Sequence, residues 1–136
     1  MPSALKQTNS FDLSSYRRPK REAGYYKAVE MLIEPGAEKI LEDMGRLMRS
    51  KARSKVIDAA LTLIRENYHI SEVKAWFSEP RFAPSRRTTI RISNENAQYL
   101  SFLAALVEKG RPTVLLDMVY FAAVNLSRED IESLRD

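Results

Sequence analysis

Apolar and polar residues alternate in two short stretches of this chain, and each stretch precedes two segments with helical spacing. The first copy of this pattern covers residues 27–68 and the second covers residues 86–127. Aligned without a gap, the copies match apolar residues at a constant offset of 59 positions (92 minus 33): Ile33 with Ile92, Leu41 with Leu100, Leu47 with Leu106 and Ile57 with Leu116. A unit of about 45 residues buries too little apolar surface to fold alone. We therefore expect the two copies to complete one another.

The two alternating stretches predict β-strands, because side chains of a strand point to opposite faces with a period of two. Val29, Met31 and Ile33 alternate with Ala28, Glu30 and Leu32 in the first copy, and Thr88, Ile90 and Ile92 alternate with Arg87, Thr89 and Arg91 in the second. The apolar set of each strand is expected to face the core. The second strand then presents a basic and polar outer face, whereas the outer face of the first is weakly polar.

Four amphipathic helices are predicted from apolar residues spaced three and four apart, over residues 37–48, 56–64, 97–107 and 114–126. Ser93 or Asn94 can cap the third of them. Gly110 is expected to end that helix in the left-handed conformation, and Pro112 suits the first turn of the next. The last helix is apolar nearly all round, so more than one of its faces should be covered, by this chain or by another subunit.

The sequence divides into four parts. Residues 1–24 lack an apolar period and end in the basic run 17–21, which predicts a disordered basic arm. Residues 25–127 are expected to form one domain of two units, 25–69 and 86–127. A connector over residues 70–85, with a short helix near 71–77, joins them, and residues 128–136 form a C-terminal tail.

Composition narrows the class of protein. The 136 residues are 44% apolar and 29% charged, and the apolar runs are all too short for a membrane span, so we expect a cytoplasmic globular protein. The absence of cysteine excludes disulfides and thiolate metal sites. Five of the 22 basic residues and two of the 18 acidic residues lie in the arm, which leaves 17 and 16 in the remainder. A few well-placed side chains would therefore have to contact any nucleic acid.

A strand followed by two helices, present twice, resembles the ribbon-helix-helix DNA-binding family. This resemblance implies a mainly α fold with a short two-stranded antiparallel ribbon, here a single-chain double ribbon-helix-helix (a pseudo-dimer) that places the ribbon in the major groove. The implied base contacts are Arg87, Thr89, Arg91, Ala28, Glu30 and Leu32. The implied phosphate contacts are Arg53, Ser54, Lys55, Arg111, Thr113, Arg86 and Lys27. Since Glu30 is acidic, most base reading is expected from the second strand.

Two copies in one chain behind a basic arm are similar to the overdrive-binding virulence proteins of T-DNA transfer. That likeness implies a monomer that binds an enhancer site in double-stranded DNA and promotes T-DNA or conjugative strand processing, with a relaxase complex and a partition-type ATPase as possible partners. A transcriptional repressor, an antitoxin or a plasmid-partition adaptor is the alternative. An alternative function of a different class is that the helices form a protein-interaction module that does not bind DNA.

Catalysis is not expected, because the sequence offers no nucleophile paired with a base, no glycine-rich phosphate loop and no spacing of metal ligands. His69 is the only histidine and has no cysteine beside it to share a metal. We therefore expect neither a cofactor nor a metal, and no enzymatic activity.

Overall fold

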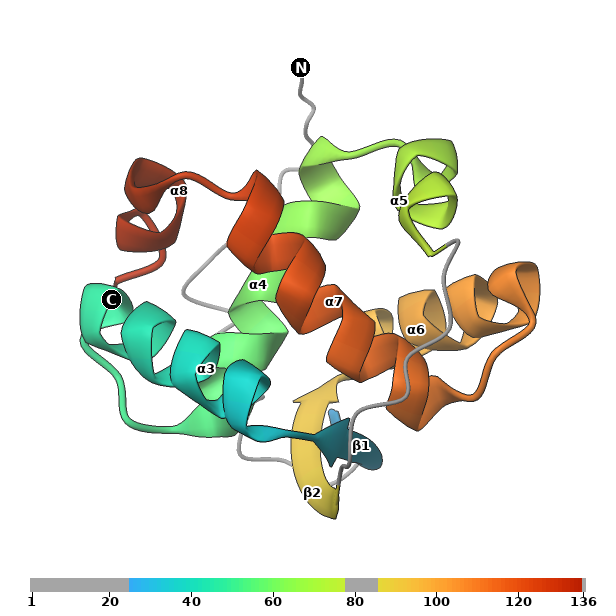
Figure 1. Cartoon of the computed structure of the whole chain (residues 1–136), viewed down its shortest axis with the longest axis horizontal. Helices are drawn as coiled ribbons and strands as arrows, with labels where there is room; N and C mark the ends of the chain where they lie inside the picture. The colour runs from blue at the N-terminus through green and yellow to red at the C-terminus, as the bar shows by residue number, and fades with distance from the viewer. Residues whose placement is uncertain (1–24, 78–85, 136) are drawn as a thin grey trace.

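The computed structural model describes residues 25–77 and 86–135, and the predicted basic arm lies outside these residues. The elements in chain order are β1 (Tyr26–Ile33), α3 (Pro35–Met48), α4 (Arg53–Asn67), α5 (Ile70–Trp76), β2 (Arg86–Ser93), α6 (Asn94–Val107), α7 (Arg111–Asn125) and α8 (Arg128–Glu132). Figure 1 shows the two strands at one edge of a body made of helices. The prediction of a mainly helical protein with a two-stranded antiparallel sheet is confirmed.

The two strands pair along their whole length, with Tyr26 opposite Ser93 at one end and Ile33 opposite Arg86 at the other. Residues directly opposite each other share a face of the sheet. Val29 and Ile90 form one buried pair in the middle of the ribbon. The predicted phase of both strands is therefore confirmed, because their apolar residues face the helices.

The strands and helices of the two halves are interlocked. Strand β1 packs mainly on α7 of the second half, and β2 packs mainly on α4 of the first half. Figure 1 shows α4 and α7 crossing directly above the ribbon, with α3 and α6 to either side. Each strand thus completes the core of the other half.

Helix α7 lies at the centre of this core. It packs against β1, α3, α4 and α6, and its residues from Val114 to Val119 are all buried. This chain itself therefore covers the helix that the sequence shows as apolar nearly all round. Of the large apolar residues that are described, only Phe102 and Val124 are strongly exposed.

In each half, the residue that ends the first long helix is not a glycine, contrary to the prediction for Gly110. Arg49 and Glu108, not a glycine, end α3 and α6 in the left-handed conformation, with φ of 61° and 59°. Gly110 has an ordinary φ of −69° and is the N-cap of α7. The prediction that Gly110 ends α6 is therefore wrong, because the left-handed turn comes two residues earlier.

Two short helices extend the body beyond the repeated pattern. The helix expected near residues 71–77 is present as α5, whose N-cap His69 accepts a hydrogen bond from the Ser71 amide. At the end of α5, the Trp76 ring makes edge contacts with Phe77 and Phe121. These aromatic side chains are thus part of the core.

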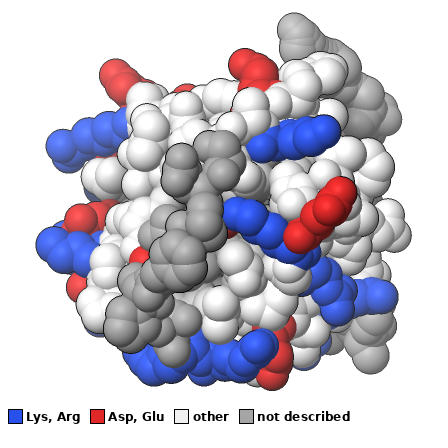
Figure 2. All heavy atoms as spheres, turned by 45° about the vertical axis from the view of Figure 1, so that its right-hand side comes forward, with Lys and Arg blue, Asp and Glu red and all other residues white. Residues whose placement is uncertain are grey.

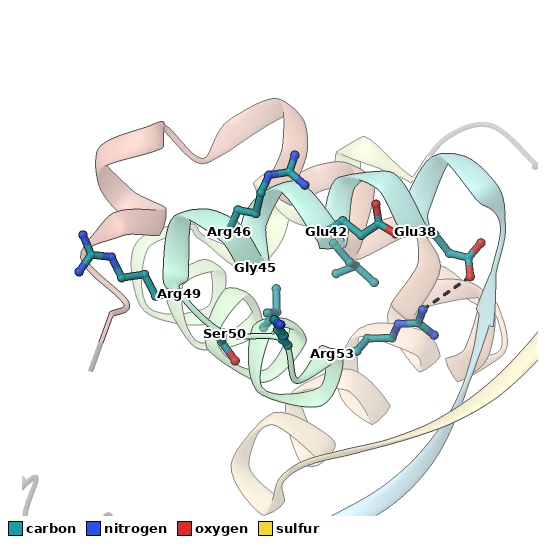
Figure 3. Close-up of a pocket in the computed structure, with 10 residues that line it drawn as sticks. Glu38, Glu42, Gly45, Arg46, Arg49, Ser50 and Arg53 are labelled. Carbon is teal, nitrogen blue, oxygen red and sulfur yellow. Dashed lines mark ion pairs between the residues drawn. The ribbon is translucent and has the colours of Figure 1, made fainter.

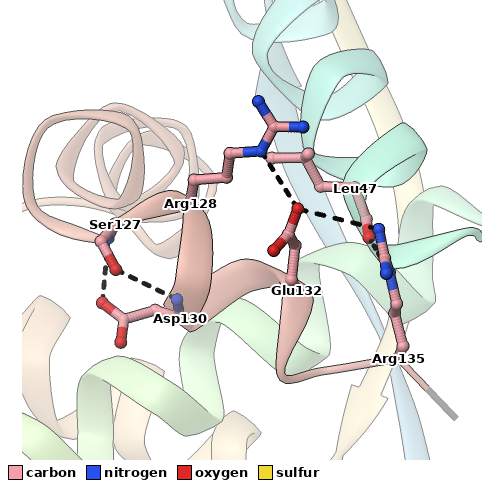
Figure 4. A network of polar contacts seen from close by, with 6 residues as sticks. All are labelled: Leu47, Ser127, Arg128, Asp130, Glu132 and Arg135. Carbon is pink, nitrogen blue, oxygen red and sulfur yellow. Dashed lines mark hydrogen bonds and ion pairs between the residues drawn. The ribbon is translucent and has the colours of Figure 1, made fainter.

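The segment predicted as a C-terminal tail contains α8, which packs on α3. Ser127 and Asp130 cap this helix reciprocally, and the Arg135 Nε donates to the Leu47 carbonyl at 2.6 Å (Figure 4). Arg128 and Arg135 both pair with Glu132. These contacts fix α8 and the residues up to Arg135 at the side of the body away from the ribbon (Figure 1).

Candidate nucleic-acid interface

The outer face of the ribbon consists of three cross-strand pairs. They are Ala28 with Arg91, Glu30 with Thr89 and Leu32 with Arg87. Five of these six residues are exposed and Leu32 is half-buried. All six residues predicted to contact bases therefore lie together on one face, opposite the buried pairs of the ribbon.

Two arginines and one carboxylate dominate the charge of this face. The Arg87 guanidinium lies 2.9 Å from the Glu30 carboxylate, and 60% of each side chain is exposed. In the described part of the chain, no ion pair involves Arg91. Arg91 is consequently the more available of the two for a ligand, whereas Arg87 is already oriented by Glu30.

The start of α4 lies against the outer edge of β2. The Arg91 amide donates to the Ser54 Oγ at 3.0 Å, and the Ser93 amide donates to the Asp58 Oδ1 at 2.9 Å. Ser54 therefore joins the first turn of α4 to the ribbon through its side-chain oxygen, a role that the sequence did not indicate. Its hydroxyl hydrogen is still able to donate to a phosphate.

Neither α4 nor α7 has a side-chain cap or an acidic residue in its first turn. The N-cap residues are Ala52 and Gly110, neither of which carries a side-chain oxygen. The amides of the first turn of a helix attract anions when nothing else satisfies them. Two such helix ends, close to the two strands, are the second feature of this face.

The predicted phosphate contacts surround the ribbon and the two helix starts. Lys27, Lys55, Arg86 and Arg111 are exposed, and Arg53, Ser54 and Thr113 are half-buried. Figure 2 shows basic side chains along the lower edge of the molecule, where the ribbon lies in Figure 1, with an acidic side chain beside them and further basic side chains elsewhere on this face. The ribbon edge is therefore locally basic, although the body as a whole is nearly neutral.

Glu38 is a part of this surface that sequence reasoning missed. Its Oε2 lies 3.6 Å from the Arg53 guanidinium (Figure 3). The same oxygen pairs with Arg86, so one carboxylate holds two predicted phosphate contacts. The sequence carries no signal for this contact, because 48 residues separate Glu38 from Arg86.

A polar network around the buried Asn96 links α4 to α6 behind the ribbon. The Asn96 side-chain amide donates to the Asp58 Oδ1 at 2.7 Å and to the Thr62 hydroxyl at 2.9 Å, and its oxygen accepts from the Arg65 Nε at 3.1 Å. Asn96 is fully buried. A satisfied buried network of this kind specifies one arrangement of its elements. Since Asp58 also accepts from the Ser93 amide at the end of β2, the network joins α4, α6 and the ribbon.

No match to this chain was found among protein-family models, curated proteins or solved structures. Of the described helices, none is long and apolar enough to cross a membrane. Residues 25–77 and 86–135 contain no cluster of His, Cys, Asp and Glu suited to a metal ion.

Proposed function

We propose that this protein is a single-chain double ribbon-helix-helix protein that binds double-stranded DNA through its ribbon in the major groove. The observation that carries the proposal is the division of the ribbon into a buried apolar face and an outer face with Arg87, Thr89 and Arg91. Strands lie about 4.8 Å apart, so a two-stranded ribbon fits a groove about 12 Å wide. Arginine side chains can donate two hydrogen bonds to guanine, and threonine can contact a base or the thymine methyl group.

The register of the ribbon supports the pseudo-dimer. Glu30 and Thr89 are directly opposite each other, and they are also 59 positions apart, which is the offset of the sequence repeat. An internal pseudo-twofold axis through this pair relates β1 to β2 and α4 to α7. Under the proposal, both helix starts then lie where each can hold a phosphate on one wall of the groove.

Within DNA binding, we propose a role at an enhancer-like site that promotes T-DNA or conjugative strand processing. The support for this role is the resemblance of the duplicated pattern to the transfer proteins, and the cellular partners it implies are a relaxase complex and a partition-type ATPase. A nicking assay with a purified relaxase on supercoiled DNA, with and without this protein, tests it. A repressor, antitoxin or partition adaptor would bind DNA equally well but leave nicking unchanged.

A protein-interaction module without DNA binding is the alternative of another class. The observations that favour it are the near balance of 17 basic and 16 acidic residues in 25–136 and the acidic Glu30 on the ribbon face. Binding measurements separate the two classes, since affinity for DNA that depends on phosphate contacts falls steeply as salt rises.

The deciding experiment compares two arginine variants on duplexes enriched from a randomised pool by the wild-type protein. Arg91→Ala should weaken binding by about 1–3 kcal/mol, or about five- to 150-fold, if the side chain reads a base. Arg128→Ala is the matched control, because Arg128 is also an exposed arginine but lies on α8, away from the ribbon. Equal binding by wild type, Arg91→Ala and Arg87→Ala would falsify the proposal.

A further inference from the structure

The outer face of the ribbon is not symmetric about the pseudo-twofold axis. The axis relates positions 28 and 87, 30 and 89, and 32 and 91. These positions hold Ala28 and Arg87, Glu30 and Thr89, and Leu32 and Arg91. Both arginines therefore lie on β2, and the corresponding positions of β1 carry no basic side chain.

The two helix starts differ in the same sense. Lys51, Arg53 and Lys55 surround the start of α4, whereas the related positions at the start of α7 are Gly110, Pro112 and Val114. Arg111 is the single basic residue among positions 110–114. The C-caps that precede the two turns even differ in the sign of their charge, since Arg49 corresponds to Glu108.

Both differences lie on one side of the ribbon. The hydrogen bond from the Arg91 amide to the Ser54 Oγ places the start of α4 against β2, the strand that carries the arginines. The turn before α4 is held close to the end of α3, because the Ser50 amide donates to the Gly45 carbonyl at 2.9 Å and a Cβ on Gly45 would meet the Ser50 oxygen at 2.6 Å. Figure 3 shows this turn, with Arg53 directed toward Glu38. The β2 side is thus the basic side.

We infer that the protein binds its DNA site in one orientation only, with β2 and the start of α4 against one DNA strand, and that this site lacks twofold symmetry. The inference rests on the proposed function and names the class of site. A ribbon with true twofold symmetry would make the same base contacts in both orientations on the DNA. Reversing this ribbon would instead place both arginines opposite different bases. Arg87 and Arg91 are four residues apart, which is about 13 Å along a strand. They would therefore contact one DNA strand at bases about three or four pairs apart.

The lack of cysteine allows the orientation to be measured directly. Arg49→Cys and Glu108→Cys each introduce one thiol at the exposed C-cap residue that precedes the turn to α4 or α7, and the two positions correspond at the offset of 59. Neither residue belongs to the helix starts that are proposed to hold phosphates, and both positions already carry a side chain in the left-handed conformation. Each variant is coupled to an iron chelate that cleaves nearby DNA, and is bound to a duplex that the wild-type chain enriches from a randomised pool.

Each label should cut one flank of the site, and the two labels should cut opposite flanks. The expected preference is about tenfold or more, because loss of one arginine–guanine contact weakens binding by that order. Equal cutting of both flanks by each label, or enrichment of palindromic duplexes, would overturn the inference and leave the proposed function intact. Failure to enrich any duplex would instead overturn the proposed function, and the inference with it.

Discussion

Replacing Glu30 by glutamine removes the one negative charge from the ribbon face while keeping the size of the side chain. At about 8 Å in water, two unit charges interact by about 0.5 kcal/mol. A carboxylate near the centre of the groove would face one backbone on each side, so its repulsion totals about 1 kcal/mol. Glu30→Gln should therefore tighten DNA binding by about two- to fivefold, the lower value applying where Arg87 neutralises part of the charge.

The ion pair between Glu30 and Arg87 allows a second, quantitative test of this prediction. An exposed ion pair such as Arg87–Glu30 contributes only about 0.2–1 kcal/mol to folding, so neither single change should lower the unfolding free energy by more than about 1 kcal/mol. In the Arg87→Ala background the carboxylate has lost its partner, and the gain from Glu30→Gln should be larger than in the wild type. A double-mutant cycle measures this difference.

Fluorescence anisotropy with a labelled duplex, recorded at several salt concentrations, supplies the four affinities. Thermal unfolding of each variant is the control for structure. A tenfold loss of affinity in Glu30→Gln would show that the carboxylate accepts a hydrogen bond from a base, such as the cytosine amino group. No change in either background would refute the reasoning, because the ribbon face would then lie far from the DNA.

Three further changes test the fold. Ile92→Ala should lower the unfolding free energy by about 2–5 kcal/mol in denaturant melts, because the Ile92 side chain is fully buried on the helix-facing side of β2. A loss below about 1 kcal/mol would contradict the assignment of Ile92 to the buried face. Burial raises the pKa of Tyr99 above its usual 10.0, against an opposing effect of Arg65, so the folded state loses stability as the pH rises beyond 10, where the unfolded state ionises first. Tyr99→Phe should reduce this alkaline destabilisation in melts from pH 8 to 11, and an unchanged profile would argue against it. Co-expressed residues 1–80 and 81–136 should assemble into one complex near 15.6 kDa, since each strand packs on the other half; folding of either piece alone would argue against interlocking.

The sequence predicted the faces of the strands because their period is local. Ile90 and Ile92 alternate with Arg91, and a shift of one residue would bury an arginine, so only one phase is physically acceptable. The amphipathic helices follow from the same kind of local pattern. These features needed no knowledge of which element packs on which.

The cap role of Gly110 and the tertiary contacts of Ser54 and Glu38 could not be predicted from a local pattern. Glycine at the junction of two helices fits either a C-cap or an N-cap, and here Glu108 adopts the left-handed conformation despite its side chain. The contacts of Ser54 and Glu38 depend on β2 reaching α4 and α3 across the chain. Contacts of that kind follow from the tertiary arrangement, which the sequence pattern leaves open.

Glu30 and Thr89, the pair at the proposed pseudo-twofold axis, illustrate what a single chain permits. In a symmetric dimer the residue on the axis faces its own copy, so a glutamate there would stand directly opposite another glutamate, and like charges at opposed positions destabilise a ribbon. In this chain Glu30 faces Thr89 instead and pairs diagonally with Arg87. Behind the ribbon, Asn96 occupies the position that corresponds to Ala37 in the first copy. The alanine side chain cannot form hydrogen bonds, so the hydrogen-bond network around Asn96 is present only in the second copy. With both copies in one polypeptide, the face and the core of each half can differ independently, as the proposed binding to an asymmetric DNA site would require.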